Sequence, residues 1–209
     1  MFTPIDKFLY SNNCEVLKIG TEYIFPIYKN GSSSLISYCN ESNGLRFSCD
    51  KLSNISDNIT VIIRDPTERF KSGLATVIYN LKMQHTELDQ STIEFLLKQY
   101  LYLDVHYVPQ FHWLLNLSRF INPKIKLHLK PMAYLKKITP SKETPFKVDK
   151  VTVSDDLVQN LYLQLDTILY NQIGNKLTFK EIVSIIKNDK HSGYDEITRV
   201  PFALVELIK

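Results

Sequence analysis

The chain has 209 residues, of which 44% are hydrophobic and 22% are charged, and its formal net charge is +3. These values exclude a disordered, self-repelling chain and predict a single domain spanning residues 1–209, because two domains of this total length would each have a small core. An excess of three positive charges is too small to indicate nucleic-acid binding, so we expect a local basic site for a small anionic ligand.

The first third of the chain predicts two strand–turn–helix units. Residues 22–27 form a short aromatic and β-branched run, which is typical of a buried strand. A glycine-containing turn follows, and a helix is expected from Leu35. Residues 59–63 are apolar almost throughout, as in the middle of a parallel sheet. Pro66 then suits the first turn of a helix that extends to about residue 81.

The remainder of the chain is predicted to be mostly helical. Residues 125–129 alternate as a strand does, a short helix is expected after Pro131, and residues 137–152 are expected to form a long irregular loop. Strand–turn–helix units early and helices late predict a three-layer α/β domain with a mainly parallel central sheet and a helical C-terminal part. Apolar residues at helical spacing indicate helices over about 91–102, 109–120, 155–172, 178–187 and 197–208.

Membrane and metal-binding signals are absent from the sequence. No run approaches the roughly 18 apolar residues that a membrane span needs, and the first residues lack the basic and apolar regions of a signal peptide. Cys14, Cys39 and Cys49 do not have the spacing of metal ligands and are typical of reduced thiols. We therefore expect a cytoplasmic protein with no metal site and no membrane or nucleic-acid partner. The sequence leaves its oligomeric state open.

A first candidate anion site follows the first predicted strand, at Lys29-Asn-Gly-Ser-Ser-Ser34. Backbone N–H groups at a helix start point outward, and the helix dipole favours negative charge there. Gly31 allows a ligand close to the backbone, the serine hydroxyls add donors, and Lys29 adds positive charge. This lysine precedes the glycine, unlike the lysine of the Gly-x4-Gly-Lys-Ser/Thr loop. The segment predicts a phosphate-binding turn, with an ordinary serine-capped turn as the alternative.

A second candidate site follows the second predicted strand. Arg64 comes directly after that strand, where ligands of open α/β sheets bind, and Ser72 lies about two helical turns further on. An arginine fork with a hydroxyl suits a phosphate monoester. The intervening Asp65, Glu68 and Arg69 are expected to be structural, as a helix cap, a dipole partner and their counter-charge.

Both segments resemble motifs of the sulfotransferases that use 3′-phosphoadenosine 5′-phosphosulfate (PAPS). Residues 26–35, Pro-Ile-Tyr-Lys-Asn-Gly-Ser-Ser-Ser-Leu, are similar to the 5′-phosphosulfate loop Pro-Lys-x-Gly-Thr/Ser-Thr/Ser-x-Leu. Residues 64–73, Arg-Asp-Pro-Thr-Glu-Arg-Phe-Lys-Ser-Gly, are similar to the 3′-phosphate motif Arg-Asp-Pro-x-Glu-Arg-x-x-Ser-Gly. Residues 104–110, Asp-Val-His-Tyr-Val-Pro-Gln, resemble a His-Trp-x-Pro-Gln segment of the carbohydrate, Golgi-type branch. The resemblance covers residues 23–138.

The chain departs from the family pattern in two places. Tyr28, rather than a proline, directly precedes Lys29. The interval between Lys29 and Arg64 is short for the family, which leaves little room for the segment that supplies a catalytic glutamate in some members. Beyond about residue 139 the sequence shows no motif of the family.

The resemblance implies a P-loop-like fold and transfer of a sulfuryl group from PAPS to a hydroxyl or amine. The acceptor would be a carbohydrate or a similar small-molecule or glycan compound, the product would be PAP, and no metal would be required. Lys29 would stabilise the charge on the leaving group. The resemblance assigns cofactor binding to Lys29, Asn30, Gly31, Ser32, Ser33, Ser34, Arg64 and Ser72.

A hydroxyl acceptor also needs a general base, for which histidine is suited at neutral pH. His106 is the candidate, because it falls in the segment that resembles the family, and Asp104 is a possible orienting carboxylate. His112 is expected to be a core residue on a helix. The carboxylates Glu41, Asp50 and Asp57 lie where some relatives have their base, and the sequence does not separate them from surface residues.

Two other functions remain open from the sequence. A nucleotide or small-molecule kinase with an atypical phosphate loop would need a carboxylate for Mg²⁺ after a strand, where this chain has Arg64. A non-catalytic protein that binds PAP or a sulfated glycan would keep the same ligand residues without turnover.

Overall fold

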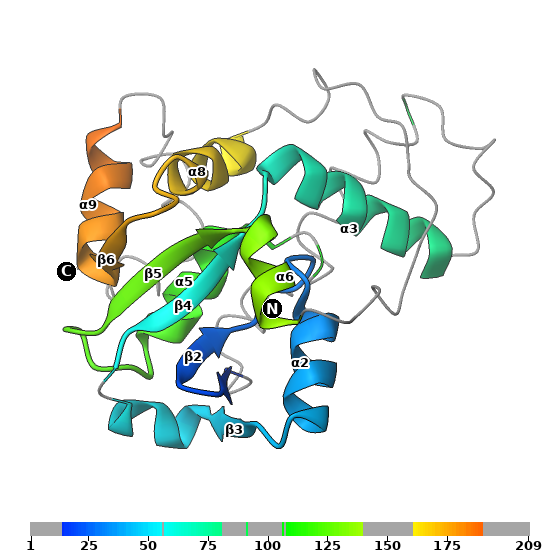
Figure 1. Ribbon diagram of the computed structural model, residues 1–209. Coiled ribbons are helices and arrows are strands. Elements are labelled where there is room, and N and C mark those ends of the chain that lie inside the picture. The colour runs from blue at the N-terminus through cyan, green and yellow to red at the C-terminus, as the bar shows by residue number, and fades with distance from the viewer. Residues whose placement is uncertain are drawn as a thin grey trace, which may run out of the picture.

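The computed structural model describes residues 14–55, 57–80, 91, 106, 108–139 and 161–189 (Figure 1). No helix in these segments is long and apolar enough to cross a membrane. The strands are β1 (Glu15–Ile19), β2 (Glu22–Phe25), β3 (Leu45–Ser48), β4 (Ile59–Ile63), β5 (Lys126–Pro131) and β6 (Lys176–Thr178). The helices are α2 (Ser32–Glu41), η1 (Cys49–Asn54), α3 (Pro66–Asn80), α5 (Gln110–Ser118), η3 (Met132–Tyr134), α6 (Leu135–Ile138), α8 (Leu161–Tyr170) and α9 (Phe179–Asn188).

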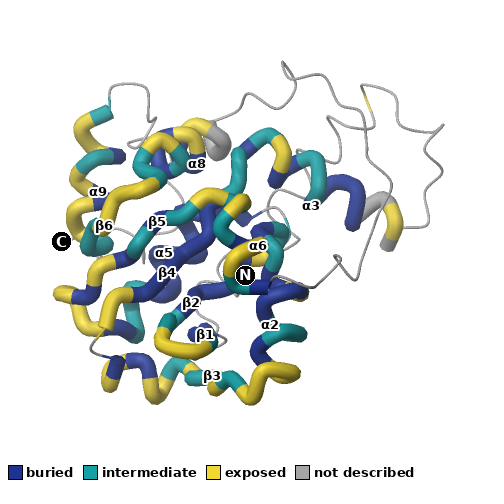
Figure 2. The backbone as a smooth tube through the Cα atoms, viewed as in Figure 1, coloured by how far each residue is buried: buried dark blue, intermediate teal, exposed yellow. Residues whose placement is uncertain are grey.

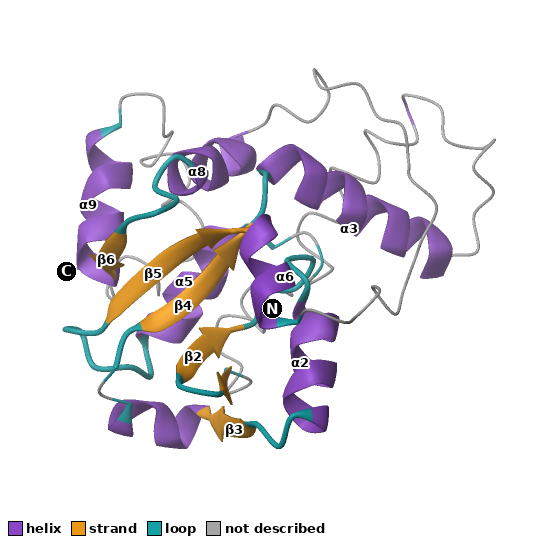
Figure 3. Ribbon diagram, viewed as in Figure 1, coloured by secondary structure: helices purple, strands orange, loops and turns teal. Residues whose placement is uncertain are grey.

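The six strands form one mixed sheet in the order β3-β1-β2-β4-β5-β6 (Figure 3). The central strands β2, β4 and β5 are parallel, with Phe25 opposite Val61 and Val61 opposite Leu129. β1 and β3 at one edge and β6 at the other are antiparallel to their neighbours. The carboxyl ends of β2 and β4 therefore lie side by side, and each is followed by a helix.

Helices pack against both faces of this sheet because its strands alternate two sets of apolar side chains. Phe25, Val61 and Leu129 belong to the larger hydrophobic cluster, together with residues of α5, α8 and α9. Ile24 and Ile62 point the other way, into a smaller cluster with Leu35 of α2 and Leu135 of α6. Figure 1 shows α5 behind β4 and β5, and Figure 2 shows β4 buried along its length.

The predicted α/β class is confirmed, whereas the mainly parallel sheet is not, because the sheet is mixed. The difference arises at the edges, where the sequence did not predict strands. A tight turn at Gly20, whose φ is 59°, joins β1 to β2 and so makes the two strands antiparallel. The predictions of β4, from residue 59 to 63, and of α3, from Pro66, match the structure closely.

Some predictions fall on parts of the chain that the structure does not describe. These are the helices over 91–102, apart from Ser91, and over 197–208, and most of the irregular loop over 137–152. The helix predicted over 155–172 corresponds to α8 within its described part.

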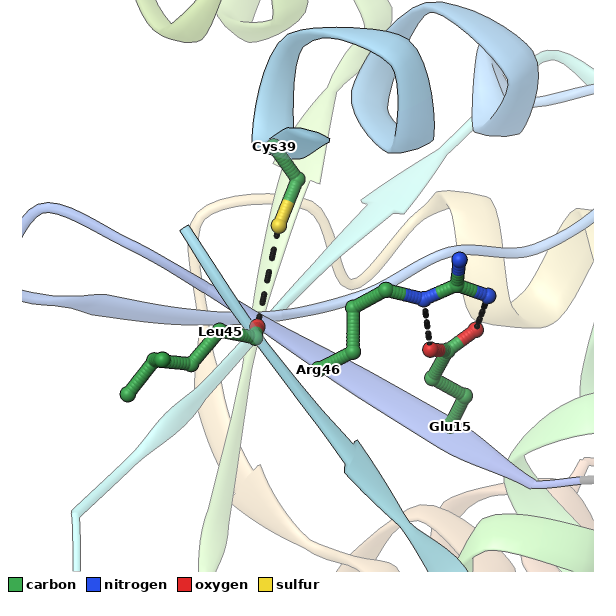
Figure 4. Close-up of polar contacts among 4 residues, drawn as sticks. All are labelled: Glu15, Cys39, Leu45 and Arg46. Carbon is green, nitrogen blue, oxygen red and sulfur yellow. Dashed lines mark hydrogen bonds and ion pairs between the residues drawn. The ribbon is translucent and has the colours of Figure 1, made fainter. Parts of the chain in front are cut away.

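Side chains reinforce the antiparallel edge formed by β1 and β3 (Figure 4). Arg46 on β3 pairs with Glu15 on β1, and its Nη2 donates to Glu15 Oε2 at 2.8 Å. Cys39 Sγ donates to the carbonyl of Leu45 at 3.6 Å. Cys14, Cys39 and Cys49 are free thiols, and burial raises the pKa of Cys14 to about 12, so this thiol stays protonated.

Candidate functional site

The two sequence-predicted anion segments meet where β2 and β4 end. Lys29 lies four residues beyond the end of β2, and Arg64 directly follows β4. Arg64 Nη1 donates to the carbonyl oxygen of Lys29 at 2.9 Å. Because β2 and β4 are parallel neighbours, two segments that are 35 residues apart in the sequence meet at the carboxyl ends of these strands.

The loop between β2 and α2 has an unusual backbone. Lys29 has a φ of 68° and Gly31 a φ of 80°, both in the left-handed region, which is strained for a lysine. The N–H of Asn30 donates to the carbonyl of Ile27 at 3.0 Å and closes a turn. Gly31 also packs closely on α6, since a Cβ at this position would lie 2.4 Å from Leu135 Cδ2. Glycine at position 31 therefore suits the left-handed φ and leaves room for the side chain of Leu135.

The first turn of α2 has neither a side-chain cap nor a negative charge. Its N-cap residue is Gly31, which has no side chain to bond the first turn, and the first turn contains no acidic residue. The first bond within the helix runs from Leu35 N to Gly31 O, so the N–H groups of Ser32, Ser33 and Ser34 have no acceptor inside the helix. Ser32 and Ser34 are buried and Ser33 is exposed.

The side chain of Lys29 points toward helix α3, close to Ser72. Lys29 Nζ donates to Thr76 Oγ1, and the same hydroxyl donates to the carbonyl of Ser72 at 3.2 Å. Thr76 lies one helical turn beyond Ser72, so the ammonium group and Ser72 occupy the same end of the site. The backbone of Lys29 thus contacts Arg64, and its side chain reaches α3 one turn from Ser72.

Arg64 is half-buried, and burial lowers the pKa of its guanidinium while Glu68 and Asp65 oppose that shift. Asp65 Oδ1 accepts the N–H of Glu68 at 2.9 Å, which confirms the predicted helix-cap role of Asp65. Glu68 is exposed in the first turn of α3, where a negative charge is favourable.

Gln110, the first residue of α5, forms hydrogen bonds with both predicted anion segments. Its Oε1 accepts from the N–H of Arg64 at 3.0 Å and from Nδ2 of Asn30 at 2.5 Å. Its Nε2 donates to the carbonyl of Arg64 at 3.0 Å. Asn30 Nδ2 also donates to the carbonyl of Ile62 at 2.7 Å. Sequence reasoning assigned no role to Gln110, although it ends the segment that resembles the sulfotransferase family.

Two buried charged residues, Asp166 and Arg69, support this arrangement. Asp166 on α8 accepts the N–H groups of Gln110 at 2.8 Å and of Phe111 at 3.1 Å. Arg69 is buried, donates from Nε to the carbonyl of Tyr28 at 3.3 Å, and is attracted by Asp166. Burial lowers the pKa of Arg69 to about 10 and raises the pKa of Asp166.

The charges that act on Arg69 differ from those the sequence predicted. It was expected to balance Asp65 and Glu68, its neighbours on α3, whereas the carboxylate that raises its pKa is Asp166 on α8. Both Arg69 and Asp166 are buried, so the attraction between them is weakly screened by water.

His106 lies beside the loop, next to Tyr28. Its ring stacks on Tyr28 with the centroids 5.8 Å apart, and Tyr28 also contacts Trp113 of α5 at 4.9 Å. Tyr28 directly precedes Lys29 and is 40% exposed. Asp104, the predicted orienting partner of His106, lies outside the described residues.

His112 is a core residue, as expected. It is 1% exposed, and burial lowers the pKa of its imidazole to about 4, so the ring is neutral at physiological pH. This histidine packs edge-on against Phe111, at a centroid distance of 5.9 Å.

The three carboxylates proposed from sequence as alternative bases are exposed and placed away from the loop. Glu41 ends α2, about 14 Å along the helix from Ser32. Asp57 precedes β4, whereas Arg64 follows it. Asp50 lies in η1, next to the edge strand β3, which β1 separates from β2. Among the residues that the structure describes, no group of three His, Cys, Asp or Glu side chains is placed to hold a metal ion.

Comparison with known proteins gives no match: no family model, no curated protein and no solved structure is similar to this chain. A function for this chain is therefore proposed from the geometry of the site and from the sequence motifs.

Proposed function

We propose that the chain is a PAPS-dependent sulfotransferase that transfers the sulfuryl group to a hydroxyl or amine of a carbohydrate or similar acceptor. The observation that carries the proposal is the contact between Arg64 and the Lys29 carbonyl at 2.9 Å. At this contact, a loop suited to the 5′-phosphosulfate meets an arginine suited to the 3′-phosphate, beyond the carboxyl ends of β2 and β4. PAPS carries both groups on one nucleotide, so a single ligand can contact both segments.

The 5′-phosphosulfate group would bind at the start of α2. The N–H groups of Ser32–Ser34 and the serine hydroxyls offer donors to its oxygens, and the helix dipole favours its negative charge. The 3′-phosphate would bind Arg64, whose guanidinium has further N–H groups besides the one that contacts Lys29, together with the hydroxyl of Ser72.

Lys29 would act on the leaving group. When the acceptor oxygen attacks sulfur, a new S–O bond forms and the bond from sulfur to the bridging oxygen breaks, so that PAP leaves with the electron pair. Charge then grows on the bridging oxygen, and a nearby ammonium group stabilises it. In the structure this ammonium contacts the hydroxyl of Thr76, a neutral group that a bridging oxygen can replace as acceptor.

His106 would accept the proton that the acceptor hydroxyl loses. Its ring stacks on Tyr28, which directly precedes Lys29 in the loop. The carboxylates Glu41, Asp50 and Asp57 are less suitable, because they lie away from the loop.

A kinase would require a carboxylate that holds Mg²⁺ after a strand. The first carboxylate after β4 is Asp65, and its Oδ1 is engaged in capping α3. The geometry therefore favours the sulfotransferase over the kinase. A protein that binds PAP without turnover would share the site, and only an activity measurement separates it from the enzyme.

The test is a transfer assay with sulfur-labelled PAPS and a panel of oligosaccharides and phenols, run beside labelled ATP and Mg²⁺ on the same panel. We expect label transfer from PAPS without added metal. Phosphoryl transfer from ATP would support the kinase, and PAP binding with no transfer to any acceptor would support the non-catalytic protein.

A further inference from the structure

We propose that Gln110 is a positioning residue that couples the two halves of the anion site, so that a ligand at Arg64 also orders the loop at residues 29–34. The inference rests on the proposed function, because the ligand groups at the two halves are taken to be the phosphates of PAP. It adds a residue that contacts neither phosphate and acts through Asn30 and Arg64.

The side-chain amide of Gln110 is bonded to both halves of the site. Its oxygen accepts from Asn30 Nδ2 at 2.5 Å and from Arg64 N at 3.0 Å, and its nitrogen donates to Arg64 O at 3.0 Å. Asn30 belongs to the first half of the site and Arg64 to the second. They are 80 and 46 residues from Gln110 in the sequence, so these bonds join three separate segments of the chain.

The amide is itself held firmly. Gln110 is 0% exposed and Asn30 is 1% exposed, so their hydrogen bonds do not compete with water. The backbone N–H of Gln110 donates to Asp166 Oδ2 at 2.8 Å, which fixes the point from which the side chain extends. A buried amide with these bonds is costly to displace, since each lost partner leaves a polar group unsatisfied.

A second route connects the halves and explains why the coupling works in both directions. The backbone of Arg64 is bonded through both its N–H and its C=O, which sets the direction of its side chain, and that side chain donates to Lys29 O at 2.9 Å. A phosphate that immobilises the guanidinium therefore also restrains Lys29, and an ordered loop presents Arg64 in its binding position. Thermodynamic linkage makes the effect reciprocal.

The experiment compares wild type with Gln110→Met, which keeps the length and volume of the side chain but removes all three bonds. Asn116→Leu is the matched control, because Asn116 is a buried amide on the same helix whose oxygen accepts from Arg119. The probes are PAP and 3′-AMP, which carries only the 3′-phosphate. The readouts are affinity by calorimetry and hydrogen exchange at the amides of residues 30–34 and of Arg64.

We expect 3′-AMP to slow exchange in the 30–34 loop of wild type and of Asn116→Leu, and to slow it much less in Gln110→Met, where only the contact from Arg64 to Lys29 O remains. The Arg64 amide should exchange about tenfold or more faster in Gln110→Met, and PAP affinity should fall about tenfold or more. If Gln110→Met does not fold, Gln110→Glu serves instead. It keeps the oxygen that accepts from Asn30 and from Arg64 N, but replaces the donor to Arg64 O with an oxygen that repels that carbonyl, so a loss of the same coupling is expected.

Loop protection by 3′-AMP in the Gln110 variant equal to that in wild type would overturn the inference and leave the proposed function standing. The same holds if Gln110→Met loses only thermal stability and binds PAP as wild type does. A wild-type protein that binds neither PAP nor 3′-AMP would instead overturn the proposed function itself.

Discussion

Lys29 combines a strained backbone with a side chain that is directed across the site. Its φ of 68° turns the chain so that its carbonyl faces Arg64 while its ammonium reaches Thr76 on α3. Left-handed backbone conformations of non-glycine residues are found at functional sites more often than elsewhere. The conformation of this one residue therefore links both anion segments and sets the position of the charge.

Lys29→Ala should lower the rate of sulfuryl transfer far more than it lowers PAP affinity. The ammonium stabilises charge that appears mainly in the transition state, and removing one such group costs about a hundred- to a thousandfold in kcat. PAP affinity, measured by calorimetry, should change by less than about tenfold. Equal losses in rate and affinity would show that Lys29 only binds the nucleotide. Lys29→Arg, which keeps the charge, is the control.

His106→Ala should remove the acidic limb of the pH–rate profile and leave PAP binding nearly unchanged. A base contacts the acceptor rather than the nucleotide, and a protonated imidazole cannot take up the acceptor's proton. His128→Ala is the matched control, because this half-buried histidine lies on β5 and has no contact with Tyr28. A wild-type profile in the His106 variant would exclude His106 as the base.

The sequence could predict the residues of the site that follow one another in short motifs. Lys29 to Ser34 and Arg64 to Ser72 are such segments, and the structure brings them together. The roles of Gln110 and Asp166 could not be predicted, because their bonds join residues 46 to 80 positions apart. No local pattern specifies which buried amide or carboxylate a distant segment will meet.

At the scale of elements, the loop and α6 are packed against each other at Gly31. Gly31→Ala adds two costs, the left-handed φ of 80° and a Cβ 2.4 Å from Leu135 Cδ2. Gly20→Ala is a matched control, because Gly20 has a φ of 59° and nothing within 4 Å of an added Cβ.

We expect Gly20→Ala to lower the free energy of unfolding by about 1–2 kcal/mol and Gly31→Ala by about 1–3 kcal/mol more. Only the second change should also weaken PAP binding, because it displaces the start of α2. Denaturant unfolding and calorimetry measure the two effects. Equal destabilisation by the two substitutions would show that Leu135 moves aside without cost.

Central elements were predictable and edge elements were not. β4 is apolar almost throughout and is followed by a proline, so its bounds are clear from the sequence. β1, β3 and β6 are three to five residues long and owe their conformation to pairing with a neighbouring strand. The helix after the first anion segment begins at Ser32 rather than Leu35, since its first turn is polar.

At the scale of the whole molecule, the buried His112 makes stability depend on pH. Its imidazole has a pKa lowered from 6.5 to about 4, so between these values the unfolded chain binds a proton that the folded chain does not. The free energy of unfolding should therefore fall as the pH drops through this window. At about 1.4 kcal/mol per pH unit, the contribution of His112 by pH 4 is about 3 kcal/mol.

His112→Phe should lose this contribution and show a flatter pH dependence of stability between pH 6.5 and 4 than wild type. Thermal unfolding across this range measures it, with His128→Ala as the control for a histidine that is only half-buried. A His112 variant with the same pH dependence as wild type would contradict the account of this core residue.

The arrangement of the whole sheet produces the site. Two parallel central strands end side by side, and at their carboxyl ends each is followed by one of the two proposed anion-binding segments. The antiparallel edge strands and the helices on both faces hold these strands in place. The central claim is that the two segments bind one nucleotide that carries both a 5′- and a 3′-phosphate.

Calorimetry with PAP and ATP, each with and without Mg²⁺, tests this claim most directly. We predict that wild type binds PAP without metal about ten- to a hundredfold more tightly than ATP, which leaves Arg64 and Ser72 without a 3′-phosphate. Arg64→Ala should remove this preference while the protein stays folded. Equal affinity for the two nucleotides, or PAP binding that requires Mg²⁺, would contradict the account.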